Sequence, residues 1–482
     1  MARSARGRAA ALIAPLLVAA CTVGPNYQRP PLTPAAGYGP AASETSGATL
    51  VDGADVPAQW WQVYHSAELD ALVTLALKNS PTVEAAKAAL RAAQEQVRAQ
   101  RGADYPQITG SLQPSRQKFA NTLASPLANN EELFSLTTTQ VAVSYSPDLF
   151  GANRRAVESL QAQADQQRFE LEAARLTLAS NVVTASIQDA LLRAQIDENH
   201  AIIDENLQAV ASFERQLKAG QISSADLAAQ QAALAAAEAA LPPLRKAYRL
   251  NRDLLAALVG RTPGEPVEAR FELASLTLPD QLPLSLPAQL VEHRPDVRIA
   301  EEQLHSASAQ IGVAKAARLP NIELSAAAGG AALALVPEFG PATNFWSLAA
   351  TLTEPIYDGG TLLHRQRAAE AAYQQAAAQY QGTVVGAFQN TTDALQAISS
   401  DGDALRTAEA ARAASRRSLE IARHQLTAGQ GTALAVLSAE QADHTARLAT
   451  LQAQASRYDD VAALFQALGG GWWNDKTAVA TR

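Results

Sequence analysis

Two stretches of the chain have the apolar pattern of unusually long α-helices. Residues 152–219 contain neither proline nor glycine, and residues 361–428 contain no proline. In the first stretch, apolar side chains recur at steps of three, four and seven in two series, the first at Leu176, Val183, Ile187 and Leu191 and the second at Ile203, Leu207, Val210 and Leu217. Such steps are typical of helices that pack along one another as coiled coils. A continuous helix over the first stretch would be about 100 Å long.

Each long helical pattern ends at a glycine, Gly220 in the first and Gly429 in the second. A helical pattern then starts again within a few residues. Glycine in the left-handed conformation ends helices and lets the chain reverse direction. The sequence therefore predicts two long helical hairpins, at about 152–260 and about 361–468.

Alternating apolar and polar residues precede each long helix and predict strands. Apolar positions alternate at Ile108, Gly110, Leu112, Val141, Val143 and Tyr145, and again at Ile322, Leu324, Ala326, Trp346, Leu348, Ala350 and Leu352. We expect β-hairpins at about 105–147 and about 319–356. Aromatic side chains near the strand ends are similar to the girdles of transmembrane barrels.

These elements occur twice because the chain contains an internal duplication. Ser80-Pro81-Thr82-Val83 returns as Arg294-Pro295-Asp296-Val297, 214 positions later, and the segment around Gly220 returns around Gly429, 209 positions later. Two copies are too few for a solenoid, which stacks many short repeats. They fit a pseudo-symmetric pore in which each copy supplies an equivalent part of the wall.

The duplication and the composition of the connecting segments predict the domain organisation. We expect, in chain order, a signal peptide (1–20), a lipidated tether (21–60), the first repeat (61–260), a proline-rich linker (261–290), the second repeat (291–473) and a C-terminal tail (474–482). Proline, glycine, alanine and serine dominate the tether, which is typical of an extended segment. We expect it to let the lipid lie away from the folded part.

The first residues have the pattern of a bacterial export signal. Three arginines precede an apolar run that is too short to span a bilayer. A run of small residues comes directly before Cys21, the only cysteine, and resembles a lipobox, in which Cys21 would carry the lipid. An ordinary signal peptide with an incidental cysteine is the alternative. Residue 22 is threonine rather than aspartate, and the resemblance to bacterial lipoproteins then favours the outer membrane.

Composition and motifs argue against several classes of function. The net charge of −8 includes no basic stripe, so a nucleic-acid partner is not expected. Phosphate-binding loops, G-x-S-x-G and H-E-x-x-H are missing, and we predict no catalytic residue, cofactor or metal site. The seven histidines are scattered, and we interpret them as solvated residues on helix faces. No stretch of eighteen apolar residues occurs, so membrane crossing would require a closed barrel.

One carboxylate is a candidate for a pore function. Asp226 lies six residues beyond Gly220, at the start of the helix after the first turn. In an assembly around an axis it could form a ring of carboxylates that favours cations. The alternative is an acid that complements the dipole of its own helix.

Several motifs together resemble the outer-membrane efflux proteins, the TolC-like channel-tunnels, and in particular their lipoprotein branch of the OprM/NodT type. These motifs are Cys21-Thr22-Val23-Gly24-Pro25-Asn26-Tyr27-Gln28-Arg29-Pro30, Trp60-Trp61-Gln62-Val63-Tyr64, Asp148-Leu149-Phe150-Gly151, Pro355-Ile356-Tyr357-Asp358-Gly359-Gly360 and Leu468-Gly469-Gly470-Gly471-Trp472. The resemblance extends over nearly the whole chain after Cys21.

The resemblance implies a mostly α-helical fold with a transmembrane β-barrel part. Four strands per chain cannot close a barrel, whereas a homotrimer would supply twelve, and the long helical hairpins would form a periplasmic tunnel. The implied function is a passive outer-membrane exit duct for small molecules or drugs. Its implied partners are a periplasmic membrane-fusion adaptor, an inner-membrane pump of the resistance-nodulation-division or a related class, and outer-membrane lipids.

The sequence departs from this family after the second turn. Many members carry two aspartates six and nine residues beyond the glycine, which narrow the periplasmic aperture, whereas this chain has Ala435 and Ser438. Asp226 is the remaining acid at the equivalent of the nearer position. We therefore expect a weaker cation preference at this aperture than in members that carry both acids.

Two other interpretations of the sequence remain open. The same fold also serves as the exit duct of type I protein secretion, although the lipobox argues against that use. A lipid-anchored structural coiled coil without a pore would also have long amphipathic helices.

Overall fold

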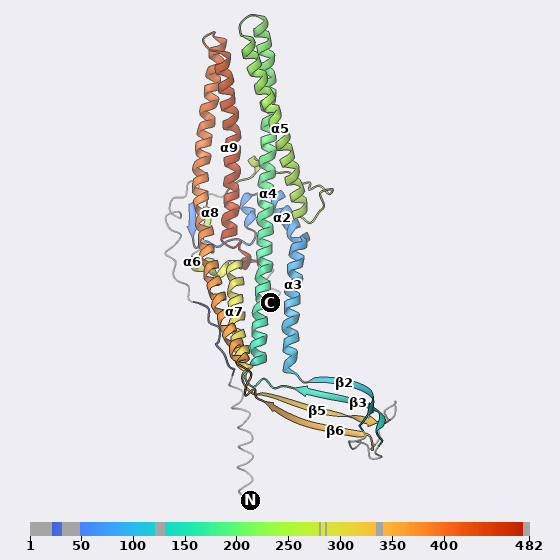
Figure 1. The fold of residues 1–482 in the computed structure, drawn as a ribbon. Helices are drawn as coiled ribbons and strands as arrows, with labels where there is room; N and C mark the ends of the chain where they lie inside the picture. Colours follow the sequence, from blue (N-terminus) through green and yellow to red (C-terminus); the bar gives the residue numbers. More distant parts are fainter. Residues whose placement is uncertain are drawn as a thin grey trace. The chain divides into compact units, whose positions relative to one another are not determined.

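The computed structural model describes residues 22–30, 49–120, 131–278, 281–284, 287–333 and 341–475 (Figure 1). The predicted signal peptide and Cys21 lie outside these residues. The chain divides into two compact units. The described residues up to Pro30, together with Leu90–Gln167 and Ala300–Tyr380, form the first unit, and the other described residues form the second. Each unit therefore combines segments from both repeats.

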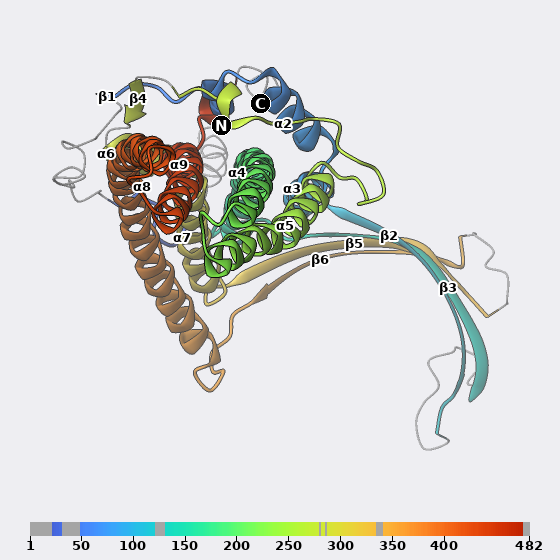
Figure 2. The same cartoon turned by 90° about the horizontal axis from the view of Figure 1, so that it is seen from above.

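The first unit contains a four-stranded antiparallel sheet. Its strands are β2 (Gln107–Lys118), β3 (Leu133–Tyr145), β5 (Asn321–Ala332) and β6 (Asn344–Thr353), in the order β2-β3-β5-β6. Each repeat supplies one hairpin, and the pairing of β3 with β5 joins the two hairpins into one curved sheet (Figure 2). The two predicted hairpins and their four strands are confirmed. Within the described residues, the outer edges of β2 and β6 have no partner strand.

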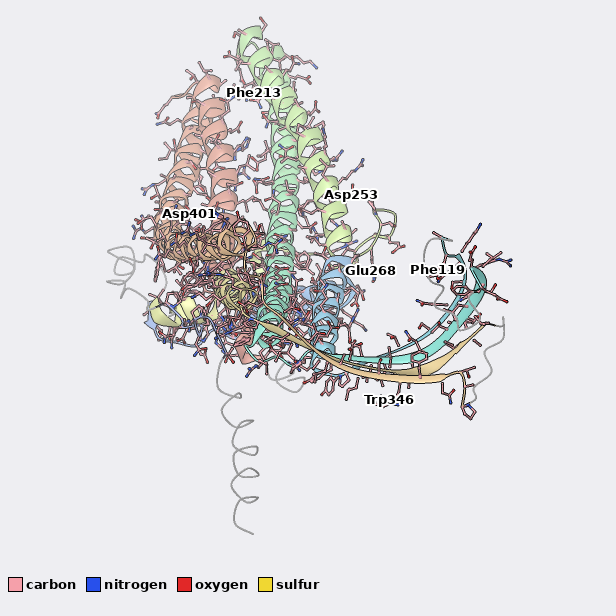
Figure 3. The ribbon with its side chains drawn as sticks, turned by 60° about the horizontal axis from the view of Figure 1, so that its bottom comes forward. Phe119, Phe213, Asp253, Glu268, Trp346 and Asp401 are labelled. Atoms are coloured by element: carbon pink, nitrogen blue, oxygen red, sulfur yellow. The ribbon has the colours of Figure 1, made fainter. Side chains whose placement is uncertain are left out.

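The strand register divides the side chains of the sheet between two unlike faces. Ile108 pairs with Val143, and Leu352 pairs with Ile322, so these apolar residues share one face. Large side chains on this face are unusually exposed, and Trp346 has 80% of its surface accessible (Figure 3). The opposite face consists mainly of serine, threonine, glutamine and alanine. An exposed apolar face of this size is typical of a surface that contacts lipid or another protein.

The long helices have matching lengths in the two repeats. The helices are α2 (Ala67–Asn79), α3 (Pro81–Arg101), α4 (Ala152–Lys218), α5 (Ser224–Leu258), α6 (Pro287–His293), α7 (Pro295–Ala316), α8 (Thr361–Thr427) and α9 (Ala433–Ala467). Helices α4 and α8 each have 67 residues, and α5 and α9 each have 35. This equality confirms the internal duplication. Among the described helices, none has both the length and the apolar character that crossing a bilayer requires.

Short elements and buried aromatics complete the second unit. Its strands β1 (Thr49–Asp52) and β4 (Gln281–Leu284) pair in parallel, and its 3₁₀ turns are η2 (Trp60–Tyr64), η4 (Leu273–Ser275) and η5 (Trp472–Asn474). The 3₁₀ turn η3 (Gly102–Asp104) belongs to the first unit. Trp60 is buried and stacks on Phe465 with ring centroids 5.4 Å apart. The Tyr64 hydroxyl donates a hydrogen bond of 2.7 Å to the Tyr458 carbonyl. The paired tryptophan motif therefore forms part of a core.

Candidate functional site

The two helical turns have the same backbone hydrogen bonds. After α4, the N–H of Gly220 donates to the Leu217 carbonyl and the N–H of Gln221 donates to the Gln216 carbonyl. The turn after α8 repeats both bonds with Gly429, Leu426, Gln430 and Gln425. Both glycines are left-handed, with φ of 70° and 72°. This is the Schellman arrangement, which satisfies the last carbonyls of a helix and requires a residue that tolerates positive φ.

Asp226 and Ala435 occupy equivalent positions at the starts of α5 and α9. The Ser223 hydroxyl accepts a hydrogen bond from the Asp226 N–H, and the Asp226 carboxylate accepts bonds from the Ser223 N–H and hydroxyl, which completes a capping box. These bonds lower the pKa of Asp226, so the carboxylate is ionised at neutral pH. In α9, Thr432 caps the Ala435 N–H, but Ala435 returns no bond.

The structure thus assigns Asp226 a local role in capping its helix. Ala435 and Ser438 are exposed and provide no charge. The two turns therefore share one backbone arrangement but differ electrostatically, because only the first has a carboxylate beside the N-terminus of its second helix.

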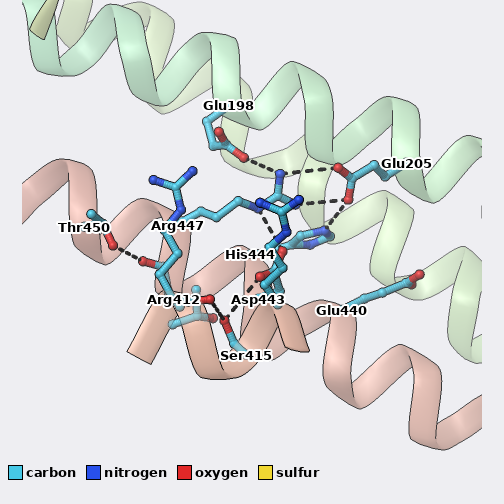
Figure 4. A network of polar contacts seen from close by, with 12 residues as sticks. Glu198, Glu205, Arg412, Ser415, Glu440, Asp443, His444, Arg447 and Thr450 are labelled. Atoms are coloured by element: carbon cyan, nitrogen blue, oxygen red, sulfur yellow. Dashed lines mark hydrogen bonds and ion pairs between the residues drawn. The ribbon is translucent and has the colours of Figure 1, made fainter. Parts of the chain in front are cut away.

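A cluster of ionic groups connects the two helical hairpins (Figure 4). Arg447 of α9 contacts Glu198 and Glu205 of α4, with N–O distances of 2.7 and 3.0 Å, and Asp443 of its own helix at 3.1 Å. His444 lies 3.1 Å from the Glu205 carboxylate. We call these five residues the Arg447 cluster. It joins the first repeat to the second inside the second unit.

Electrostatics in the Arg447 cluster favour the charged forms. Burial opposes ionisation of Glu205, but hydrogen bonds from Arg447 and His444 outweigh it and lower the pKa of Glu205. Burial likewise disfavours the Arg447 cation, yet the bond to Glu205 and the field of Glu198 leave the pKa of Arg447 raised. Asp443 also accepts a hydrogen bond of 3.2 Å from Ser415 of α8, so the cluster reaches three helices.

The expectation that the histidines are solvated is wrong for three of them. His293, at the end of α6, is half-buried and stacks on Trp473 with ring centroids 4.0 Å apart. His444 is largely buried, with its side chain 12% exposed, and belongs to the Arg447 cluster. His305 lies between Glu158 and Glu302, at 3.1 and 3.4 Å. Sequence reasoning missed these contacts because Glu205, Glu158 and Trp473 lie far along the chain from the histidines that they contact. Two local signals were available: Asp443 and Arg447 are spaced i, i+4, and Glu302 and His305 are spaced i, i+3, which places each pair on one helix face.

The prediction of an extended tether that keeps the lipid away from the folded part is also wrong for residues 22–30, which pack within the first unit as an N-terminal segment. The N–H of Val23 donates to the Phe150 carbonyl at 3.0 Å. Arg155 of α4 donates to the Val23 carbonyl at 3.3 Å and to the Asn26 side chain at 2.7 Å. The Tyr27 ring stacks on His305 of α7, with centroids 4.3 Å apart. The segment therefore contacts helices of both repeats.

Two glycines, Gly24 and Gly151, allow close approaches that fix this N-terminal segment. A Cβ atom on Gly24 would lie 2.5 Å from the Gly312 Cα, and Gly24 has a φ of +100°. A Cβ on Gly151 would lie 2.5 Å from the Thr22 side chain. Thr22 is the first described residue, so the position that follows Cys21 is held beside the start of α4.

Docking of the N-terminal segment should depend on pH through His305. Its hydrogen bond to Glu302, and then that to Glu158, raise the pKa of His305 above 6.5, although burial opposes this. A raised folded-state pKa contributes stability below the unfolded value that is lost as pH rises through the folded value. We expect hydrogen exchange of residues 22–30, corrected for intrinsic rates, to become faster as pH rises through that range.

The histidine substitutions test this pH dependence. His305→Gln should remove most of it, whereas His424→Gln, at an exposed position on α8, should leave it unchanged. Equal pH dependence in the parent chain and in His305→Gln would contradict the assignment to His305.

Comparisons with known proteins agree with the duplicated architecture. The sequence model of the outer membrane efflux protein family matches residues 72–261 and 286–470. These stretches begin 214 positions apart and end 209 positions apart, which are the two offsets of the internal repeat.

Relatives match over almost the whole chain. Outer membrane protein OprJ of Pseudomonas aeruginosa is 31% identical over 501 residues, which cover 100% of this chain and 99% of OprJ. The pyoverdine export outer membrane protein OpmQ of Pseudomonas putida is 28% identical, in an alignment that covers 92% of this chain and 95% of OpmQ. The solved structure of the outer-membrane channel OprN matches with a TM-score of 0.86 at 25% identity, over 94% of this chain and 100% of OprN. The chain belongs to the outer membrane efflux protein family, and it functions as the outer-membrane channel of a tripartite efflux system.

Proposed function

We propose that three copies of this chain form a passive exit duct for small molecules, anchored by a lipid on Cys21. The observation that carries the proposal is the sheet of the first unit, with one exposed apolar face, one polar face and unpaired edges on β2 and β6. An unpaired edge cannot face lipid, because its N–H and C=O groups would lack hydrogen-bond partners. Pairing β6 of one copy with β2 of the next would close a barrel of twelve strands.

Membership of the family supports our proposal for the partners and the membrane position. We propose a periplasmic membrane-fusion adaptor and an inner-membrane pump of the resistance-nodulation-division or a related class, because a duct without an energy source needs both. The bound N-terminal segment supports the lipid anchor, since Thr22 lies against Gly151, a few residues after β3. We further propose that the two predicted repeats, 61–260 and 291–473, have equivalent roles, each supplying one β-hairpin to the barrel and one helical hairpin to the tunnel.

Two neighbouring residues of β6 provide a matched test of the barrel. Leu348 lies on the apolar face, and Ser347 lies on the polar face. Lysine on the lipid face of a barrel costs about 2–4 kcal/mol near the bilayer midplane, and each trimer would carry three such residues. We expect Leu348→Lys to abolish heat-modifiable trimers in the outer-membrane fraction, whereas Ser347→Lys should retain both trimers and conductance in planar bilayers.

If Ser347→Lys abolished trimers and Leu348→Lys did not, or if both variants behaved alike, the assignment of the apolar face to lipid and the polar face to the lumen would be overturned. A monomer that mild salt releases from membranes, without conductance, would overturn the duct itself and favour a lipid-anchored coiled coil.

We also propose that the turns after α4 and α8 form the periplasmic aperture, where Asp226 provides the remaining carboxylate. Ala435→Asp should complete a second capping box with Thr432 and raise the cation preference, measured as the reversal potential in a salt gradient. Ala435→Asn provides a cap without a charge and should leave the preference unchanged. An unchanged reversal potential in Ala435→Asp would show that this position lies away from the ion path.

A further inference from the structure

The polar face of the four-stranded sheet contains one ionisable side chain among its described strand residues. Cross-strand pairs place Ser144 opposite Ser325 and Thr351 opposite Glu323, so these residues share the face that carries no large apolar cluster. The rest of that face consists of hydroxyl, amide, small and a few apolar side chains. Glu323 is exposed to solvent in the single chain.

Positive charges of the described strands lie on the other face. Arg116 pairs with Ser135 and Lys118 pairs with Leu133, which places both on the same side as Ile108, at the far end of β2. No cation of the described strands therefore shares a face with Glu323. A carboxylate on a strand surface whose other residues carry no charge attracts mobile cations and repels anions.

Glu323 lies at the end of the sheet where the strands meet the helices of the first unit. It is the third residue of β5, shortly after the end of α7 at Ala316. The backbone there is held by Ser146, whose hydroxyl donates to the Ile322 carbonyl at 3.1 Å and to the Asn321 side chain at 3.0 Å. The position of Glu323 along the barrel axis is thus fixed by strand pairing and by this local bond.

We propose that Glu323 from three copies forms a ring of carboxylates inside the barrel, at its junction with the helices, which makes the duct prefer cationic over anionic solutes. The inference rests on the proposed trimeric barrel, because the polar face becomes the lumen only when the sheet closes. A ring of like charges around a water-filled pore is a common source of charge selectivity. Asp226 lies after the turn of the first helical hairpin and would act separately.

Reversal potentials of the full-length chain in planar bilayers, under a potassium chloride gradient, test the ring. We expect Glu323→Gln to shift the reversal potential toward zero and Glu323→Lys to move it further, toward anion preference. The shift should be larger at low salt, since the screening length is about 10 Å at 0.1 M and about 3 Å at 1 M. Glu323→Asp should keep the parental sign.

Arg116→Gln provides the matched control for the face assignment. It removes a charge from the apolar side of the sheet and should leave the reversal potential unchanged. An unchanged potential in Glu323→Gln, with normal conductance, would overturn the ring while the duct stands. A shift in Arg116→Gln but not in Glu323→Gln would also overturn the ring, because it would show that the face of Arg116, and not that of Glu323, lines the lumen. Absence of conductance in the parent chain would overturn the proposed function and the ring with it.

Discussion

Replacing Gly471 with alanine should destabilise the chain far more than the same replacement at Gly382. Gly471 has a φ of +72°, and an added Cβ atom would lie 2.4 Å from the Pro57 carbonyl oxygen and 2.5 Å from that of Val56. Both contacts are to backbone, which cannot rotate away. The left-handed conformation alone costs roughly 1–2 kcal/mol for a residue with a Cβ, and the clash brings the expected loss to about 3 kcal/mol.

Gly382 and Gly470 give this experiment its controls. Gly382 lies inside α8, and a Cβ there would meet nothing within 4 Å, so alanine should stabilise the helix by about 0.5–1 kcal/mol. Gly470→Ala should be less harmful than Gly471→Ala, because its clash is with the flexible side chain of Leu176. Thermal melts followed by circular dichroism in detergent would rank the three variants. Equal melting temperatures for Gly471→Ala and Gly382→Ala would contradict the close packing of this turn.

Replacing Arg447 with methionine should weaken the contact between the two helical hairpins. Glu198, Glu205 and Asp443 would then face one another without their shared cation. Breaking a buried ion pair costs several kcal/mol of stability, whereas breaking an exposed one costs very little. Because the Arg447 side chain is 16% exposed, we expect this substitution to lower the free energy of unfolding by about 2 kcal/mol.

Spin labels at Leu207 and Leu434 can follow the separation of the hairpins, because both side chains are exposed and lie on α4 and α9. The chain has one native cysteine, Cys21, which can be replaced by alanine for this purpose. We expect a broader, longer distance distribution in Arg447→Met. Arg416→Met removes an exposed arginine that pairs only with Glu420 within α8 among the ion pairs described, and it should leave the distribution unchanged. A narrow parental distribution in Arg447→Met would show that apolar packing alone holds the hairpins.

The fold was predictable from the sequence because its signals are local and occur twice. Uninterrupted helical pattern, a glycine at each turn and alternating strand residues each follow from short-range stereochemistry. Pro81 and Pro295 begin α3 and α7, where proline loses no helical hydrogen bond. The pairing of β3 with β5 was not predicted, because it depends on residues almost two hundred positions apart.

The functional details were less predictable, because they depend on contacts between distant segments. The cap at Asp226 could be inferred from Ser223, three residues before it. Stabilisation of its own helix was accordingly one of the two roles that the sequence predicts for Asp226, beside a ring of carboxylates in a pore. By contrast, nothing near Glu205 indicates that Arg447 will neutralise it. Composition alone also gave the wrong expectation for residues 22–30, since small residues and prolines are compatible with both a free chain and a tightly bound one.

The pairing of β3 with β5 has a consequence for engineering. In a trimer, six hairpins would surround the axis. The β3–β5 junction within each chain would alternate with the β6–β2 junction between chains, so the exact symmetry would be threefold rather than sixfold. A substitution in one repeat would then appear at three alternate positions of six. Ala435 could accept a charge, a label or a cross-linker while its counterpart Asp226 keeps its cap, and a ring with two alternating chemistries could be built from a single gene.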